Sequence, residues 1–196
     1  WNIILSGRVK SPLYRFDFYS WKERFKHDGL TPSLRIELRE LLTPRVSLKE
    51  IPHWRHKLLE NDNECPARVN ELVDCEVVLT DHARSALLGK DNRDWQSVLP
   101  LLQEDLHFLL RDALDLQREL GQADDFSDLS YWHLPSIEHH WQNRGFHDWI
   151  SLIELLRDAW LRINEDDKTH AAQIAVKWFQ LPYPTFKRLA FFAASK

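Results

Sequence analysis

Large apolar residues recur every three or four positions between Asp148 and Ile163, and polar residues fill most of the positions between them. This spacing is that of one face of an α-helix, so the stretch predicts an amphipathic helix at the centre of the fold. We expect Asp148 to cap it. The apolar stripe consists of Trp149, Leu152, Ile153, Leu156, Trp160 and Ile163. The opposite side, where we expect weak ion pairs facing solvent, carries Glu154, Arg157, Asp158 and Arg162.

Similar spacing predicts further helices on both sides of this stretch. Thr31 followed by Pro32 is a typical helix start, and Gly121 is typical of the position after a helix end. Pro100 predicts either a kink in the longest helix or its true start. The expected helices cover residues 31–42, 53–60, 94–120, 169–179 and 184–195, with one or two helical turns over 20–26.

Three segments are open to more than one interpretation. Residues 46–49 fit either a strand or a helix start in which Ser47 and Glu50 form a capping box. Residues 66–88 fit a helix, or a helix that contains a strand-like stretch at 75–79. The alternation over residues 14–18 indicates a short strand or an extended arm.

The sequence therefore predicts a mainly α fold, arranged as a helical bundle or an α-solenoid-like array with a short extended N-terminal arm. The scarcity of glycine, five in 196 residues, favours helices over a turn-rich β fold. We expect an aromatic and basic arm over residues 1–28, a helical subdomain over 29–121 and a C-terminal helical subdomain over 122–196 that begins with a polar loop.

Composition is that of a packed domain, with 43% hydrophobic and 29% charged residues. The chain shows neither a signal-peptide pattern nor an apolar run of membrane-spanning length. Cys65 and Cys75, without a second pair, favour neither a disulfide framework nor a zinc module, so we expect a cytoplasmic protein. The chain starts at Trp1 and lacks methionine. We expect either an internal segment of a longer protein, or a chain as written from which methionines are missing, in which case some spacings are shifted.

Charge is segregated along the chain. Residues 1–60 carry net +5, residues 61–170 net −13 and residues 171–196 net +4. The acidic middle argues against a broad nucleic-acid groove. Basic residues interleaved with aromatics in the arm still allow a nucleic-acid contact as one alternative. That contact would use Arg8, Lys10, Arg15, Lys22, Arg24 and Lys26.

The densest polar cluster lies in residues 135–148. Its potential zinc ligands are Glu138, His139, His140 and His147. Adjacent histidines point apart on a helix, so we favour a structured loop in which Gln142 and Asn143 bind backbone groups and cap the next helix. A partner-contact loop is a further hypothesis. Its candidate residues are Gln142, Asn143 and Arg144, together with Lys187 and Arg188 on the last helix.

Recognisable catalytic patterns are absent from the sequence. It lacks a Gly-x-Ser-x-Gly elbow and a glycine-rich phosphate loop, and no carboxylates are visibly paired in an apolar setting. The acidic segment 122–130, with Asp124, Asp125 and Asp128, lacks the ligand spacing of a calcium loop, so we expect a solvated loop. We predict no enzymatic activity and no cofactor for this segment.

Four stretches resemble the helical C-terminal region of large bacterial anti-phage defence proteins, of the Avs/STAND NTPase or sirtuin-like type. They are GLTPSLRIELRELLTPRV at 29–46, PSIEHHWQN at 135–143, LLRDAW at 155–160 and PYPTFKRLA at 182–190. The resemblance implies a helical scaffold or sensor surface that contacts a protein partner or a sister subunit, with effector and nucleotide-binding domains elsewhere in the parent protein. It assigns no active-site residue to this segment.

The leading prediction is accordingly a non-catalytic interaction module. One alternative is a metal-binding or hydrolytic domain centred on Glu138, His139, His140 and His147. The other is nucleic-acid contact through the N-terminal arm.

Overall fold

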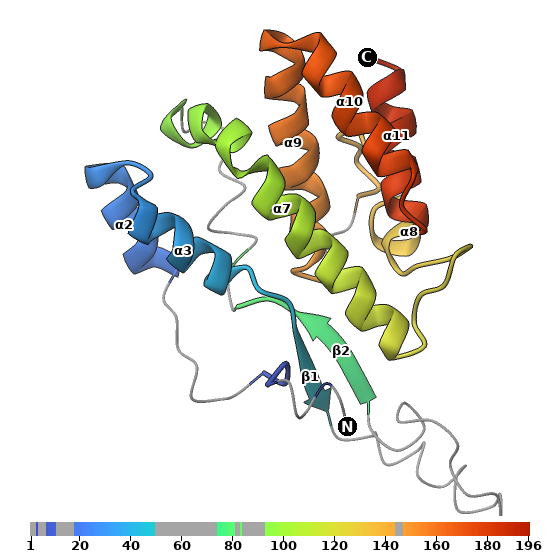
Figure 1. Ribbon diagram of the computed structural model, residues 1–196. Helices are drawn as coiled ribbons and strands as arrows, with labels where there is room; N and C mark the ends of the chain where they lie inside the picture. The colour runs from blue at the N-terminus through green and yellow to red at the C-terminus, as the bar shows by residue number, and fades with distance from the viewer. Residues whose placement is uncertain are drawn as a thin grey trace, which may run out of the picture.

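The computed structural model describes residues 3, 7–10, 18–49, 74–80, 83, 93–143 and 147–196. Over these residues the fold is mainly α-helical with one two-stranded antiparallel sheet, which confirms the predicted fold class (Figure 1). The helices are α2 (Phe18–Asp28), α3 (Pro32–Leu41), α7 (Arg93–Glu119), α8 (Ser130–His133), α9 (Ile150–Asp166), α10 (Lys168–Phe179) and α11 (Pro184–Ala194). The strands are β1 (Arg45–Lys49) and β2 (Asp74–Val78).

Helix α9 occupies the centre of the helical layer, as its periodicity predicted. It packs against α7 on one side and α10 on another, and α10 in turn packs against α11 (Figure 1). All six residues of the predicted apolar stripe are buried. The indole N–H of Trp160 donates a 2.9 Å hydrogen bond to the carbonyl of Ala171, which fixes α9 to α10.

The polar side of α9 faces solvent only in part, so the prediction is wrong for Glu154 and Arg157, whereas the side chain of Arg162 is 43% exposed. Glu154 and Arg157 are 7% and 1% exposed. The reason is the loop before α9, which covers this side and receives a hydrogen bond from Arg157 at the carbonyl of Ile137. The ion pairs on this side join Arg157 to Asp158 and Arg162 to Glu165.

The start of α9 also differs from expectation. Its N-cap residue is Trp149, and no side chain caps the helix. Asp148 instead accepts a 3.0 Å bond from the amide of Ser151 through its backbone carbonyl.

Helix α7 runs for 27 residues, about 40 Å. It matches the predicted range within a residue at each end, and Pro100 lies inside it. Gly121 ends the helix with φ of 72°, a left-handed conformation that glycine adopts without strain. The amide of Gln122 then bonds to the carbonyl of Gln117 at 2.8 Å, the pattern that closes many helices.

Residues 18–28 of the predicted extended arm form a helix, α2. Phe18, Trp21 and Phe25 have helical spacing and are buried. Trp21 stacks on Phe25 with ring centroids 5.2 Å apart, and both rings meet Trp95 of α7 edge-on. The indole of Trp21 also donates to the carbonyl of Leu34, which holds α2 against α3.

Helix α3 begins as predicted. Thr31 is the N-cap and accepts from the amide of Leu34, and Pro32 occupies the first turn. Two arginines then join α3 to α7, because Arg35 and Arg39 both contact the carboxylate of Asp105.

The two ambiguous segments at 46–49 and 75–79 pair as strands. Val46 lies opposite Val77 and Ser47 opposite Glu76, so the helix start capped by Ser47 does not form. Val9 adds a parallel bridge to Val46. Predicted features over residues 11–17 and 53–60 lie outside the described residues.

One cluster of buried side chains runs from Phe18 to Ala193 and includes residues of all three predicted segments. In the described part of the chain, no helix is long and apolar enough to cross a membrane. Helices α7, α9 and α10 share this core, and their packing against one another holds the domain together.

We expect Leu114→Ala to lower the free energy of unfolding by about 2–5 kcal/mol, because Leu114 is fully buried in α7 and the substitution leaves a cavity. Leu101→Ala on the same helix is the matched control, since Leu101 is 62% exposed, and should cost less than about 0.5 kcal/mol. Urea unfolding followed by circular dichroism measures both. Equal losses would contradict the packing described for α7.

Candidate functional site

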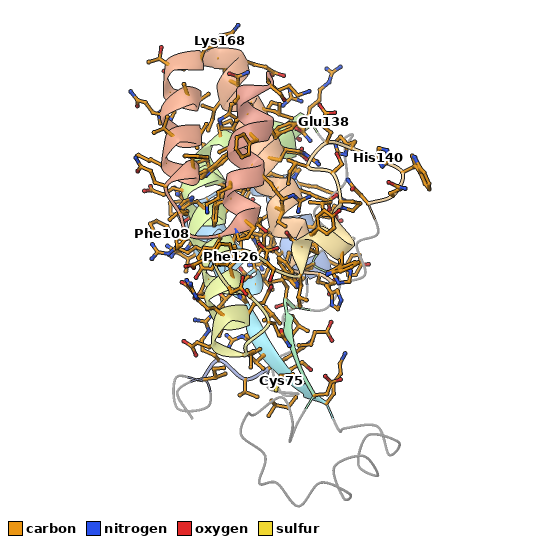
Figure 2. All side chains as sticks on the ribbon, turned by 90° about the vertical axis from the view of Figure 1, so that its right-hand side faces the viewer. Cys75, Phe108, Phe126, Glu138, His140 and Lys168 are labelled. Carbon is orange, nitrogen blue, oxygen red and sulfur yellow. The ribbon has the colours of Figure 1, made fainter. Side chains whose placement is uncertain are left out.

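The predicted polar cluster at 135–148 forms most of the loop that joins α8 to α9, and residues 144–146 lie outside the described part. His140 lies at the outer edge of this loop, on the side of the domain opposite Phe108 (Figure 2). Its neighbours reach inward to α9, α11 and β2, so the histidines of the cluster have different surroundings.

Glu138 and His139 are held by different helices. Glu138 forms an ion pair with Lys196 after α11, and this pair lowers the pKa of the Glu138 carboxyl. His139 accepts a 3.1 Å contact from the guanidinium of Arg157 in α9. The two side chains therefore serve separate contacts.

His140 and His147 also diverge. The ring nitrogen Nδ1 of His140 accepts from the amide of Gln142 at 3.2 Å. His147 contacts Glu76 of β2. The structure thus does not bring the four proposed zinc ligands together, and within the described ranges no three His, Cys, Asp or Glu side chains meet in a metal-binding arrangement.

Asn143 fixes the shape of the loop. Its side-chain oxygen accepts from the amide of Ser136, and its side-chain nitrogen donates to the carbonyl of Glu138 at 2.8 Å. Asn143 therefore binds backbone groups as predicted, but the predicted cap on the next helix does not form, since α9 has no side-chain cap. Arg144 lies outside the described residues.

Arg188, predicted as a partner contact, is largely committed to the interior. It donates to the hydroxyl of Ser130 at 3.0 Å and to the carbonyl of Leu134. Burial lowers the pKa of its guanidinium, although Asp128 and Tyr131 raise it. Lys187, the other candidate, is half-buried on α11.

Asp128 joins α8 to α11, contrary to the expectation of a solvated acidic loop. Its carboxylate is buried and accepts from the amide and hydroxyl of both Ser130 and Thr185. Because Thr185 is in the first turn of α11, one carboxylate satisfies free N–H groups at the starts of two helices. Asp124 turns back onto the amides of Phe126 and Ser127, and these bonds lower its pKa.

Three exposed aromatic side chains lie on α8 and on the loop that follows it, and we refer to these three residues together as the aromatic surface. Tyr131 and Trp132 of α8 are 62% and 77% exposed, and Trp141 of the loop is 80% exposed. Tyr131 and Trp132 meet edge-on at 5.9 Å, and the guanidinium of Arg188 lies 5.8 Å from the Tyr131 ring. These three residues were not among the candidates predicted from the sequence. The feature of the sequence that could have identified them is the presence of large aromatic residues, without helical spacing, in an otherwise polar segment.

A titratable cluster lies beside α8. The rings of His133 and His147 are 4.2 Å apart, and His147 and Lys49 both contact Glu76. Burial by itself would raise the pKa of the Glu76 carboxyl. The contacts with Lys49 and His147 together lower this pKa by more, so it lies below its ordinary value. Burial and the neighbouring His147 lower the pKa of His133, against an opposing effect of Glu76.

The basic residues proposed for nucleic-acid contact are partly committed to carboxylates. Arg8 donates to both carboxylate oxygens of Asp112 in α7, at 2.9 and 2.6 Å, and to the carbonyl of Pro44. Arg24 pairs with Glu37, and Lys26 pairs with Glu23. Arg15 lies outside the described residues, and the remaining candidates are Lys10 and Lys22.

No protein-family model, curated protein or solved structure matches this chain. The geometry of the surfaces described above is therefore the basis for any functional proposal.

We expect Arg157→Met to lower the free energy of unfolding by about 2–3 kcal/mol, because it removes a buried charge that holds Asp158 and the carbonyl of Ile137. Arg162→Met on the same helix is the control. Arg162 pairs with Glu165 near solvent, so its loss should cost less than about 0.5 kcal/mol. Urea unfolding gives the energies, and hydrogen exchange of residues 134–143 should rise only in the Arg157 variant.

We expect His133→Gln to reduce the loss of stability on acidification. The pKa of His133 is lowered in the folded chain, so the unfolded chain binds a proton first as the pH falls through the ordinary histidine range. The wild-type chain should therefore lose stability between about pH 7.5 and 5.5, and the variant should lose less. His140→Gln, in the exposed part of the loop, should retain the wild-type slope. Parallel slopes for wild type and the His133 variant would refute this assignment.

Proposed function

We propose that this chain is a non-catalytic helical interaction module of a larger bacterial protein, which binds a protein partner or a sister subunit through the aromatic surface. The observation that carries the proposal is the exposure of Tyr131, Trp132 and Trp141 on a framework held by buried hydrogen bonds.

Exposed tyrosine and tryptophan are the side chains that contribute most to protein interfaces, since each supplies a large apolar area and loses little conformational freedom. The framework beneath them is already ordered by Arg157, Asn143 and Arg188. Binding would therefore not have to order this loop, which reduces its entropic cost.

The charges beside the aromatic surface are largely paired within the chain. Glu138 pairs with Lys196, and Arg188 is directed toward Ser130 and Leu134. We infer a partner that presents apolar area and hydrogen-bond acceptors for the indole N–H groups, with little net charge. Such binding should depend weakly on salt, in contrast to a nucleic-acid contact.

The resemblance to anti-phage defence proteins supports placing this module in a cytoplasmic bacterial defence protein, with nucleotide-binding and effector domains in other parts of the parent chain.

The test compares the Trp132→Ser/Trp141→Ser double variant with wild type and with Phe179→Ser. Phe179 is a 53% exposed aromatic on α10 and contacts Phe191 rather than the loop, so its substitution controls for a general loss of exposed apolar area. Proteins captured from the source cells by the wild-type chain are identified, purified and titrated by calorimetry. The double variant should weaken binding at least about tenfold, and the control should not.

Sedimentation of the chain alone tests the sister-subunit form of the proposal. A dimer at about 100 µM that is lost only in the double variant would support it. A monomeric chain whose captured proteins bind the double variant as well as wild type would contradict the proposal. So would turnover of a substrate that a single polar substitution abolishes.

A further inference from the structure

A cavity of about 430 Å³ lies between α7 and α10, with Arg35 of α3 at one edge. Its volume is in the range of small-molecule sites. It is distinct from the aromatic surface, since Tyr131, Trp132 and Trp141 are not among its lining residues. Phe108 of the cavity also lies on the side of the domain opposite His140 in the loop (Figure 2).

One part of the cavity is apolar. Leu101 and Phe108 of α7 are seven residues apart and so lie on the same face of the helix. Both side chains are more than half exposed. Ile174 and Trp178 of α10 lie opposite them in the cavity lining and are buried. An apolar group that enters between the two helices would cover surface that water now contacts, which favours binding.

The other part of the cavity is polar with an excess of positive charge. Its charged lining residues are Arg35 and Lys177, against Glu104 alone. The Arg35 guanidinium is held by Asp105 at 2.6 Å and remains 43% exposed. Lys177 has neither an ion pair nor a side-chain hydrogen bond among the described residues, so its ammonium is available for a ligand.

His107 lies at the same place, packed against Phe186 with ring centroids 5.1 Å apart. The pKa of its imidazole is lowered. Burial is the largest cause of the lowered pKa, and the positive charges of Arg111 and Lys177 add to it. Glu104 has the opposite effect on this pKa. A neutral imidazole keeps one donor and one acceptor, and none of the described residues bonds to either nitrogen.

We propose that this cavity binds a small amphipathic anion, a carboxylate carried on an apolar body of about one aromatic ring. The apolar body lies between Leu101, Phe108 and Ile174. The carboxylate lies toward Lys177, where Arg35 and His107 add donors. A cation of the same shape would meet Lys177 and Arg35 with like charge and bind more weakly. This inference is independent of the proposed protein partner.

The experiment titrates the ¹⁵N-labelled chain with 4-phenylbutyrate and, separately, with 4-phenylbutylamine. These probes have the same apolar body and opposite charge. The butyrate should shift the amides of residues 101–108 and 170–178, with half-saturation in the millimolar range expected for about a dozen heavy atoms. The amine should bind at least about fivefold more weakly.

Two lysine variants localise the charge. Lys177→Gln should weaken butyrate binding about fivefold and leave the amine unchanged or slightly improved. Lys187→Gln on α11 removes the same charge outside the cavity lining and should stay within about twofold of wild type. The proposal is overturned by equal binding of both probes, by shifts confined to residues 130–143, by no shifts up to about 20 mM butyrate, or by wild-type affinity in Lys177→Gln.

Discussion

The architecture depends on the enclosure of α9. Helices α7 and α10 cover its apolar sides, and the 134–143 loop covers the side that carries Glu154 and Arg157. A helix enclosed in this way must satisfy its charges internally, because burying an unpaired charge costs several kcal/mol. Arg157 meets this requirement by donating to Asp158, to His139 and to the loop backbone at Ile137. The same contacts shape the loop that presents Trp141.

Periodicity located the helices and the core because both follow from one-dimensional spacing. The stripe from Trp149 to Ile163 is buried where the pattern placed it. The error on the polar side of α9 has a clear cause. A charged residue opposite an apolar stripe predicts solvent only if nothing else covers it, and the covering loop is irregular and carries no period that could reveal its position.

The candidate site illustrates the same limit. The sequence pointed to a candidate segment at 135–148 through its polar residues, and it did not point to Trp141 in that segment or to Trp132 before it. In the structure the polar side chains Asn143 and Arg157 hold the loop from within, while the tryptophans face outward. Irregular backbone has few partners of its own, so long polar side chains supply them. Which side chains point inward and which point outward depends on tertiary contacts, and residue type alone does not reveal it.

Exposure alone does not select the aromatic surface. Phe126 is 92% exposed and Ile36 is 71% exposed, and single exposed apolar residues are ordinary on folded proteins. What separates Tyr131, Trp132 and Trp141 from these is the buried polar framework behind them. The carboxylate of Asp128 accepts hydrogen bonds at the starts of both α8 and α11. Arg188 of α11 donates to Ser130 in α8 and to the carbonyl of Leu134, the residue after α8. The contacts that cover Arg157 also fix the loop that carries Trp141, so the enclosure of α9 and the exposure of this ring have one structural cause.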